Sequence, residues 1–218
     1  MKNLECPLQP PEYESLDSLV LRIEGENGHA CCLILEDHRE KFTSFPGSSG
    51  NHQAWPGGYF DHVTEIMNIG SILYHNLNSL RTLPFSESDV LLITFLHDLE
   101  KPFKYTYDDN GMFVINPELR TKEAGEEFKA HQIAKYGIVL NDMQANALEF
   151  VEGIRDDKYR KDSRVMGELA ALCHMADVWS ARGWYNHPLP EDDEWTGAAR
   201  INPGASAVRL ETEFPQRI

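Results

Sequence analysis

The chain has 218 residues, which is enough for one domain with a sizeable hydrophobic core. It carries 35 acidic and 20 basic residues, which gives a formal net charge of −15 at pH 7. This balance excludes a protein whose main task is to bind duplex nucleic acid, because such binding depends on Lys and Arg neutralising phosphates. With 41% hydrophobic and 25% charged residues, the composition is typical of a folded globular protein rather than a disordered chain.

No apolar run has the length that a signal peptide or a membrane span requires, so we expect a cytoplasmic protein without a membrane partner. The cysteines are Cys6, Cys31, Cys32 and Cys173. Two adjacent cysteines are poor disulfide partners, and no Cys-x-x-Cys pair is present. Free thiols are therefore expected.

Residues 1–54 are predicted to form a β-rich N-terminal extension. Two apolar runs, residues 18–24 and 29–36, flank the sequence Gly-Glu-Asn-Gly at 25–28, and this pattern is typical of a β-hairpin. A loop punctuated by Gly and Pro follows over residues 45–58.

Residues 55–185 are predicted to form a helical domain, so the expected fold class is mainly α. Apolar residues at helical spacing predict helices over about residues 63–77, from the capping residues 86–89 to Pro102, and over about 123–136, 142–153 and 165–181. Gly137 is expected to end the helix that begins near residue 123.

Three other segments are predicted to lack helix. Residues 103–116 are a second, short hairpin insertion with Asn110 and Gly111 at its turn. Residues 155–164 are expected to form a charged loop. Residues 186–218 are expected to form an irregular acidic tail that packs on the same domain.

His97 and Asp98 are adjacent at the end of a very apolar predicted helix. An unpaired buried charge is costly, and a divalent cation would satisfy both groups, since it binds neutral His nitrogen and ionised Asp oxygen. The alternative is a capped helix end, with His97 bonded to the last carbonyls and Asp98 at the surface. The pair by itself leaves both interpretations open.

Further polar residues occur in the other predicted helices: His62 in a first turn, His131 in mid-helix and Asp177 late in an apolar helix. The ordered set of His62, His97-Asp98 and Asp177, each on its own helix, resembles the HD superfamily of metal-dependent phosphohydrolases over about residues 55–182. The resemblance implies an HD-domain helical bundle.

Two segments are similar to one branch of that superfamily, the branch related to 3′–5′ exoribonucleases. Gly57-Gly-Tyr-Phe-Asp-His62 resembles its Gly-Gly-x-x-x-His motif, and His97-Asp-Leu-Glu-Lys101 resembles its His-Asp-x-x-Lys motif. Where the branch supplies another His, this chain has Val151. The difference predicts one metal ion rather than two, unless Glu149 or Glu152 replaces that histidine.

The resemblance implies that His62, His97, Asp98 and Asp177 bind one divalent ion. Such ligands do not distinguish among Mn²⁺, Mg²⁺, Fe²⁺, Co²⁺ and Ni²⁺. A bound ion would lower the pKa of water and polarise a phosphoryl oxygen, so that hydroxide could attack phosphorus.

Three residues are candidates for catalysis beside the metal. Lys101 shares a helix face with His97, and it either binds the substrate phosphate or is an ordinary C-terminal lysine. Glu100 is either a base or a solvated residue. His131 is expected to contact the phosphate as a proton donor or hydrogen-bond partner. His174, near Asp177, is either a partner of that ligand or a core histidine.

The remaining histidines receive no role: His29, His38, His52, His75 and His187. The predicted function is hydrolysis of a small nucleotide that carries a mono-, tri- or cyclic phosphate. One alternative is a 3′–5′ exonuclease or phosphodiesterase acting on short RNA or DNA, which the motifs support and the negative charge opposes. Another is an HD fold that binds a nucleotide or a protein without turnover. Homo-oligomerisation stays open.

Overall fold

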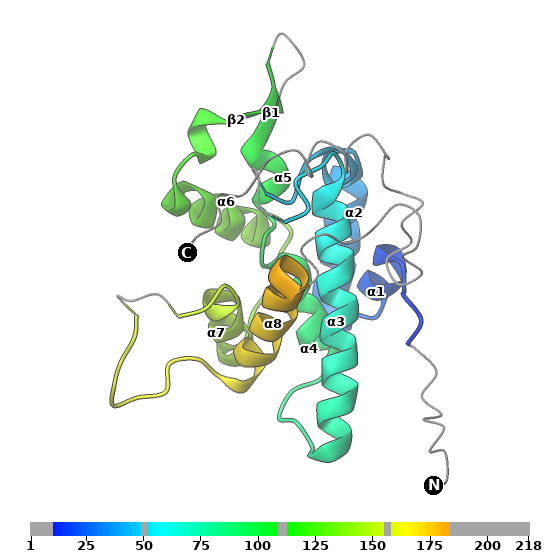
Figure 1. Ribbon diagram of the computed structural model, residues 1–218, viewed down its shortest axis with the longest axis vertical. Helices are drawn as coiled ribbons and strands as arrows, with labels where there is room; N and C mark the ends of the chain where they lie inside the picture. The colour runs from blue at the N-terminus through cyan, green and yellow to red at the C-terminus, as the bar shows by residue number, and fades with distance from the viewer. Residues whose placement is uncertain (1–10, 49–51, 109–112, 155–157, 184–218) are drawn as a thin grey trace, which may run out of the picture.

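The computed structural model describes residues 11–48, 52–108, 113–154 and 158–183 (Figure 1). This part of the chain is mainly helical, as predicted, and contains one small two-stranded sheet. The elements, in chain order, are α1 (Leu16–Leu21), α2 (Gly25–Ser44), α3 (Gly58–Leu80), α4 (Glu87–Leu96), α5 (Lys101–Lys104), β1 (Tyr105–Tyr107), β2 (Phe113–Ile115), η1 (Pro117–Leu119), α6 (Lys122–Lys135), α7 (Asp142–Phe150), α8 (Glu168–Val178) and the π-helical turn η2 (Trp179–Gly183). Within the described ranges, every helix is too short or too polar to cross a membrane.

The predicted N-terminal β-hairpin is wrong, because helices α1 and α2 occupy that segment. Leu16, Leu19, Val20 and Ile23 are all buried and recur at the spacing of a helix, not at the alternation of a strand. Gly28 is not a turn residue. It lies within α2, where a Cβ atom would come within 1.8 Å of the carbonyl oxygen of Ile23. The glycine therefore allows the first turns of α2 to pack against the backbone of Ile23, in the short connection between α1 and α2.

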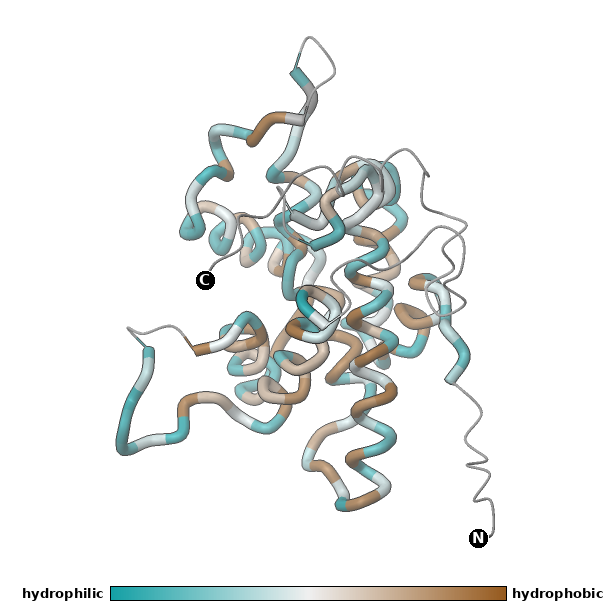
Figure 2. The backbone as a smooth tube through the Cα atoms, viewed as in Figure 1, coloured by the Kyte–Doolittle hydropathy of each residue, from teal (hydrophilic) through white to brown (hydrophobic). Residues whose placement is uncertain are grey.

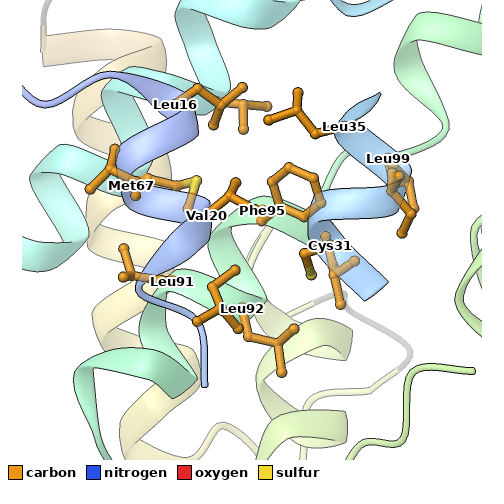
Figure 3. Close-up of a cluster of buried hydrophobic side chains, with 14 of the residues drawn as sticks. Leu16, Val20, Cys31, Leu35, Met67, Leu91, Leu92, Phe95 and Leu99 are labelled. Carbon is orange, nitrogen blue, oxygen red and sulfur yellow. The ribbon is translucent and has the colours of Figure 1, made fainter. Parts of the chain in front are cut away.

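Helices α1 and α2 share one hydrophobic core with α3 and α4 (Figure 3). This core includes the buried residues Leu16, Val20, Cys31, Leu35, Met67, Leu91, Leu92, Phe95 and Leu99. Helix α3 carries both hydrophobic and hydrophilic positions along its length (Figure 2). Its buried residues lie between Gly58 and Ser71, and the helix continues beyond them to Leu80. The N-terminal helices thus support the two helices that later supply three of the candidate ligands.

A second core joins α4 to α7 and α8. It contains Phe85, Val90, Ile93, Ala147, Phe150, Val151, Leu169, Ala170, Leu172 and Cys173. The N-terminus of α4 is fixed by a capping box, in which Ser86 and Asp89 bond to each other's backbone N–H groups. Helix α4 ends at Leu96, earlier than predicted, and Pro102 lies instead in the first turn of α5, where its missing N–H is tolerated.

The second hairpin is confirmed. Strands β1 and β2 pair antiparallel, with Thr106 opposite Val114, and residues 109–112 of its turn lie outside the described residues. Helices α6, α7 and α8 confirm the predicted helices within a few residues, and Gly137 adopts φ +74° just past α6. The cysteines in the described ranges are free, as expected. The tail 186–218 lies outside the description.

Candidate metal centre

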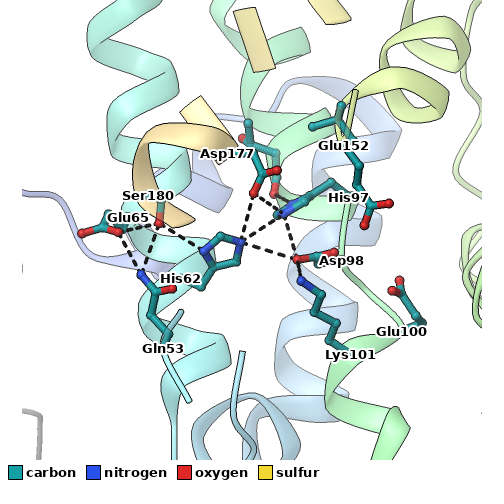
Figure 4. Close-up of polar contacts among 12 residues, drawn as sticks. Gln53, His62, Glu65, His97, Asp98, Glu100, Lys101, Glu152, Asp177 and Ser180 are labelled. Carbon is teal, nitrogen blue, oxygen red and sulfur yellow. Dashed lines mark hydrogen bonds and ion pairs between the residues drawn. The ribbon is translucent and has the colours of Figure 1, made fainter. Parts of the chain in front are cut away.

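Three helices bring four side chains to one point (Figure 4). His62 lies near the start of α3, His97 is the C-cap residue of α4 with Asp98 directly after it, and Asp177 lies in the last turn of α8. His62, His97 and Asp98 are at most 1% exposed, and the side chain of Asp177 is 17% exposed. The structure therefore brings the four predicted ligands together and leaves one of them open to solvent.

The ligand atoms of the four residues face one another. His62 Nε2 lies 3.3 Å from His97 Nε2, and 3.5 Å from both Asp98 Oδ2 and Asp177 Oδ1. His97 Nε2 lies 3.1 Å from Asp98 Oδ2 and 3.8 Å from Asp177 Oδ1. The donor atoms of His62, His97 and Asp98, all three buried, lie within 4.8 Å of one another and could hold a metal ion.

The contact that each imidazole makes through Nδ1 determines whether its Nε2 atom carries a hydrogen or a lone pair. His97 Nδ1 lies 2.7 Å from the carbonyl oxygen of Thr94, which only accepts, so Nδ1 carries the hydrogen and Nε2 has a lone pair. His62 Nδ1 lies 3.1 Å from the hydroxyl of Ser180, which donates its own hydrogen to Glu65. When both rings are neutral, two Nε2 lone pairs therefore face each other, an arrangement that a cation between them would stabilise.

The charges around Asp98 also fit a cation. Its Oδ1 atom is buried without a hydrogen-bond partner, and its Oδ2 atom forms an ion pair with Lys101 Nζ. Burial raises the pKa of Asp98, but the neighbouring His97 and Lys101 hold it well below its usual value. Burial likewise raises the pKa of Asp177, and its contact with His62 lowers it by more. Two ionised carboxylates and two imidazole lone pairs make a donor set that suits a divalent metal ion.

Asp98 and Asp177 lie at the wall of an open pocket of about 750 Å³. The pocket is lined by His52, Asp98, Lys101, Glu152, His174, Asp177, Val178, Ala181 and Arg182. Lys101 and Arg182 supply positive charge to a chain that is otherwise strongly acidic. The pocket can therefore hold a small anion beside the cluster.

Lys101 lines the pocket beside Asp98, and Glu100 does not. Glu100 lies apart from the four ligands (Figure 4), and its carboxylate lies 3.7 Å from Lys129 Nζ. Burial and the charge of Asp98 raise the pKa of Glu100. Lys129 also donates a hydrogen bond of 2.6 Å to the carbonyl of His97. The structure thus gives Glu100 a role in joining α6 to the end of α4, and it is not a solvated residue.

His131 is not brought to the cluster, so the structure does not support its predicted contact with the phosphate. Lys129, on the same helix α6, is directed at the end of α4, and His131 follows it by two residues. Two helical residues differ by about 200° around the axis, so the two side chains project on opposite sides. His131 is accordingly exposed.

Glu152 and Glu149 differ in their relation to the pocket. Glu152 lines it, while its carboxylate lies 2.7 Å from Lys122 Nζ. Glu149 lies outside it and pairs with Lys158 at 3.1 Å. His174, which the sequence left as either a partner of Asp177 or a core histidine, lines the pocket. It donates through Nδ1 to the carbonyl of Val151 at 2.7 Å.

Several residues around the cluster were not singled out from the sequence. Glu65 and Ser180 come three residues after His62 and Asp177, so the spacing of one helical turn was a usable signal for both. His52 comes from the loop before α3, and its ring lies 4.8 Å from that of His62. Burial, more than the charge of His62, lowers the pKa of His52 to about 3. No periodic pattern marks a loop residue of this kind.

The cluster could hold a metal ion beside a pocket that has room and positive charge for a small anion. Comparison with known proteins adds no assignment. No family model, no curated protein and no solved structure matches this chain.

Proposed function

We propose that this protein is a metal-dependent phosphohydrolase that acts on small nucleotides. One observation carries the proposal: the donor atoms of His62, His97, Asp98 and Asp177 converge beside a pocket that Asp98, Asp177 and Lys101 line. The order of these residues along the chain is also the order that resembles the HD superfamily. The geometry and the order of these residues therefore both support this chemistry.

The four ligands and Lys101 each have a part in this proposal. His62, His97, Asp98 and Asp177 would hold the ion. A bound divalent ion would supply a water of lowered pKa and would polarise a phosphoryl oxygen. Lys101, whose pKa the contact with Asp98 keeps raised despite burial, stays protonated and can orient a phosphate oxygen.

The size of the pocket favours a small substrate. Its volume of about 750 Å³ lies within the range of pockets that hold one small molecule, about 300–1,000 Å³. A nucleotide carrying a mono-, tri- or cyclic phosphate fits this range. A net charge of −15 opposes binding of a long polyanion, because the attraction between a polymer and its protein depends on many basic contacts.

A 3′–5′ exonuclease or phosphodiesterase is the second candidate, and one observation favours it. A cleft of about 760 Å³, lined by α6 and α7 residues, shares Glu152 with the metal pocket and contains Lys122, Lys129 and Lys158. These lysines could contact further phosphates of a short strand. Each of them also lies within 4 Å of a glutamate carboxylate, which reduces the charge available to a strand.

A panel of metals and substrates tests the proposal. Mn²⁺, Mg²⁺, Co²⁺ and Ni²⁺ are each paired with mononucleotides, triphosphates, cyclic nucleotides and short RNA. We expect turnover of a free nucleotide that depends on metal and only weakly on salt, whereas cleavage of a strand should fall steeply as salt rises. His97→Ala should abolish activity and bound metal together, and His131→Ala, at an exposed position on α6, is the matched control expected to retain both.

The outcomes separate the candidates. Degradation of short RNA with free nucleotides left intact would favour the exonuclease. Nucleotide binding without turnover would favour a binding protein. The metal centre would be refuted if the wild-type chain contained no metal and if chelator changed neither its activity nor its melting temperature.

A further inference from the structure

His62 is held from behind by three polar side chains: Gln53, Glu65 and Ser180 (Figure 4). Ser180 donates its hydroxyl hydrogen to Glu65 Oε2 and lies 3.1 Å from His62 Nδ1. Gln53 Nε2 donates to both Glu65 Oε2, at 3.1 Å, and Ser180 Oγ, at 3.3 Å. All four side chains belong to residues that are at most 1% exposed. Burying several polar side chains together costs free energy unless their hydrogen bonds are satisfied.

These bonds allow one arrangement of hydrogens on His62. A serine hydroxyl has a single hydrogen, and that of Ser180 goes to the carboxylate of Glu65. Ser180 can therefore only accept from His62, so the hydrogen of the neutral imidazole lies on Nδ1. The Nε2 lone pair is then directed at the other three ligands. Without Ser180, the imidazole would be free to carry its hydrogen on Nε2, where it would block a metal.

We propose that Glu65, acting through Ser180, is the positioning group that makes His62 a metal ligand, and that Gln53 holds this pair in place. The inference rests on the proposed metal centre. Ligating histidines commonly donate their second ring nitrogen to a carboxylate or a carbonyl, which orients the ring and increases its basicity. His97 has the carbonyl of Thr94 in this position, whereas His62 has a carboxylate relayed through a hydroxyl.

The local backbone is arranged to deliver these groups. Glu65 follows His62 by one turn of α3, and Ser180 lies in η2, a π-helical turn of a type that often occurs at functional sites. Gln53 has a φ of +41°, which is unfavourable for a residue with a side chain. Its carbonyl accepts a 2.9 Å bond from the Gly47 N–H, so the loop holds the strained residue while its amide reaches Glu65 and Ser180.

Metal affinity of single variants tests the proposal. Ser180→Ala is expected to weaken Mn²⁺ binding by roughly 10- to 100-fold, as measured by calorimetric titration of the full chain. Ser180→Thr, which retains the hydroxyl, should restore most of the affinity. Ser71→Ala is the matched control. Ser71 is also a buried serine that donates to a glutamate, Glu87 Oε1 at 2.6 Å, but it lies about 13 Å farther along α3 than His62.

Glu65→Gln provides a second variant of nearly unchanged shape. Because a neutral amide oxygen is a weaker acceptor than a carboxylate, we expect a loss of Mn²⁺ affinity smaller than that of Ser180→Ala. Nitrogen NMR of the histidine rings provides a measurement that needs no metal. In the metal-free wild type, at a pH where His62 is neutral, its hydrogen should lie on Nδ1, and the Glu65→Gln variant should show partial population of the other tautomer.

The results distinguish this inference from the proposed function. Wild-type Mn²⁺ affinity in a folded Ser180→Ala chain would overturn the positioning role, whether or not the protein hydrolyses a nucleotide. If Ser180→Ala does not fold, an Nε2–H tautomer in the wild type, or unchanged affinity in Glu65→Gln, would overturn it equally. A wild type that binds metal and shows the expected losses, but hydrolyses no phosphate ester, would refute the phosphohydrolase function and support the positioning role.

Discussion

Replacement of Lys101 by methionine should change metal affinity and turnover in opposite directions. Lys101 Nζ forms an ion pair with Asp98 Oδ2, and its side chain is 20% exposed. A metal held by Asp98 would lie about 5 Å from this ammonium, counting one ion-pair contact and one metal–oxygen bond. A charge of +1 and one of +2 at that separation repel by about 2 kcal/mol even in the dielectric of water. Lys101→Met should therefore tighten Mn²⁺ binding by roughly 20-fold.

Turnover should fall in the same variant, because the phosphate loses a charged donor. Removing one such donor from a site of developing negative charge typically lowers kcat by about 100- to 1,000-fold. Metal affinity is measured by calorimetric titration and turnover with a saturating nucleotide. Lys104→Met, in the same short helix but outside the metal pocket, is the control expected to change neither quantity.

Two results would refute this reasoning. Weaker metal binding in Lys101→Met would show that Lys101 acts mainly by holding Asp98 in position rather than by repelling the ion. Unchanged turnover would show that the lysine is an ordinary residue at the start of α5 and does not contact phosphate.

Three further predictions concern pH, packing and metal number. Burial lowers the pKa of His62, but contacts with Asp177 and Asp98 raise it above its usual value, so Mn²⁺ affinity should increase as the pH rises through that raised pKa. By the same shift, protonated His62 stabilises the metal-free protein fully below its unfolded-state pKa of about 6.5, and this stabilisation is lost as the pH rises through its folded-state pKa. Thermal unfolding in chelator at several pH values would show the loss. Gly28→Ala should lower the free energy of unfolding by about 2 kcal/mol in urea titrations, since its Cβ would collide with the backbone carbonyl of Ile23 in the connection between α1 and α2. Glu152→Gln should leave one Mn²⁺ per chain in metal analysis, and two ions in the wild type but one in the variant would contradict this.

Much of the helical fold could be predicted from the sequence, because helices with one apolar face and a capping residue carry two consistent signals. Helix α4 shows both, with its capping box and its buried apolar run. The predicted N-terminal β-hairpin was wrong because two continuous apolar runs were interpreted as strands. Leu16, Leu19, Val20 and Ile23 have helical spacing, and Gly28 lies within α2 against the backbone of Ile23 rather than in a turn.

The candidate site was predictable to the extent that its residues recur at fixed positions on helices. His62, His97, Asp98 and Asp177 form such an ordered set. His131 illustrates the limit, since its direction depends on the rotation of α6, which the contact of Lys129 with the end of α4 determines. Loop residues are harder still: the place of His52 beside His62 depends on the loop before α3, and tertiary contacts alone determine that position.

Charge in the metal pocket leads to a final prediction, that nucleotide binding requires the metal. The pocket is lined by the carboxylates of Asp98, Asp177 and Glu152 and by the cations Lys101 and Arg182, so its formal charge is 2 − 3 = −1. A nucleotide phosphate carries negative charge and should be repelled by the metal-free pocket, whereas a divalent ion changes the local charge to about +1.

Titration of a nucleotide into the chain with chelator should therefore give no measurable binding, and Mn²⁺ should restore it. Equal nucleotide affinity in both conditions would mean that Lys101 and Arg182 hold the phosphate without the metal, and that the four ligands serve a purpose separate from substrate binding.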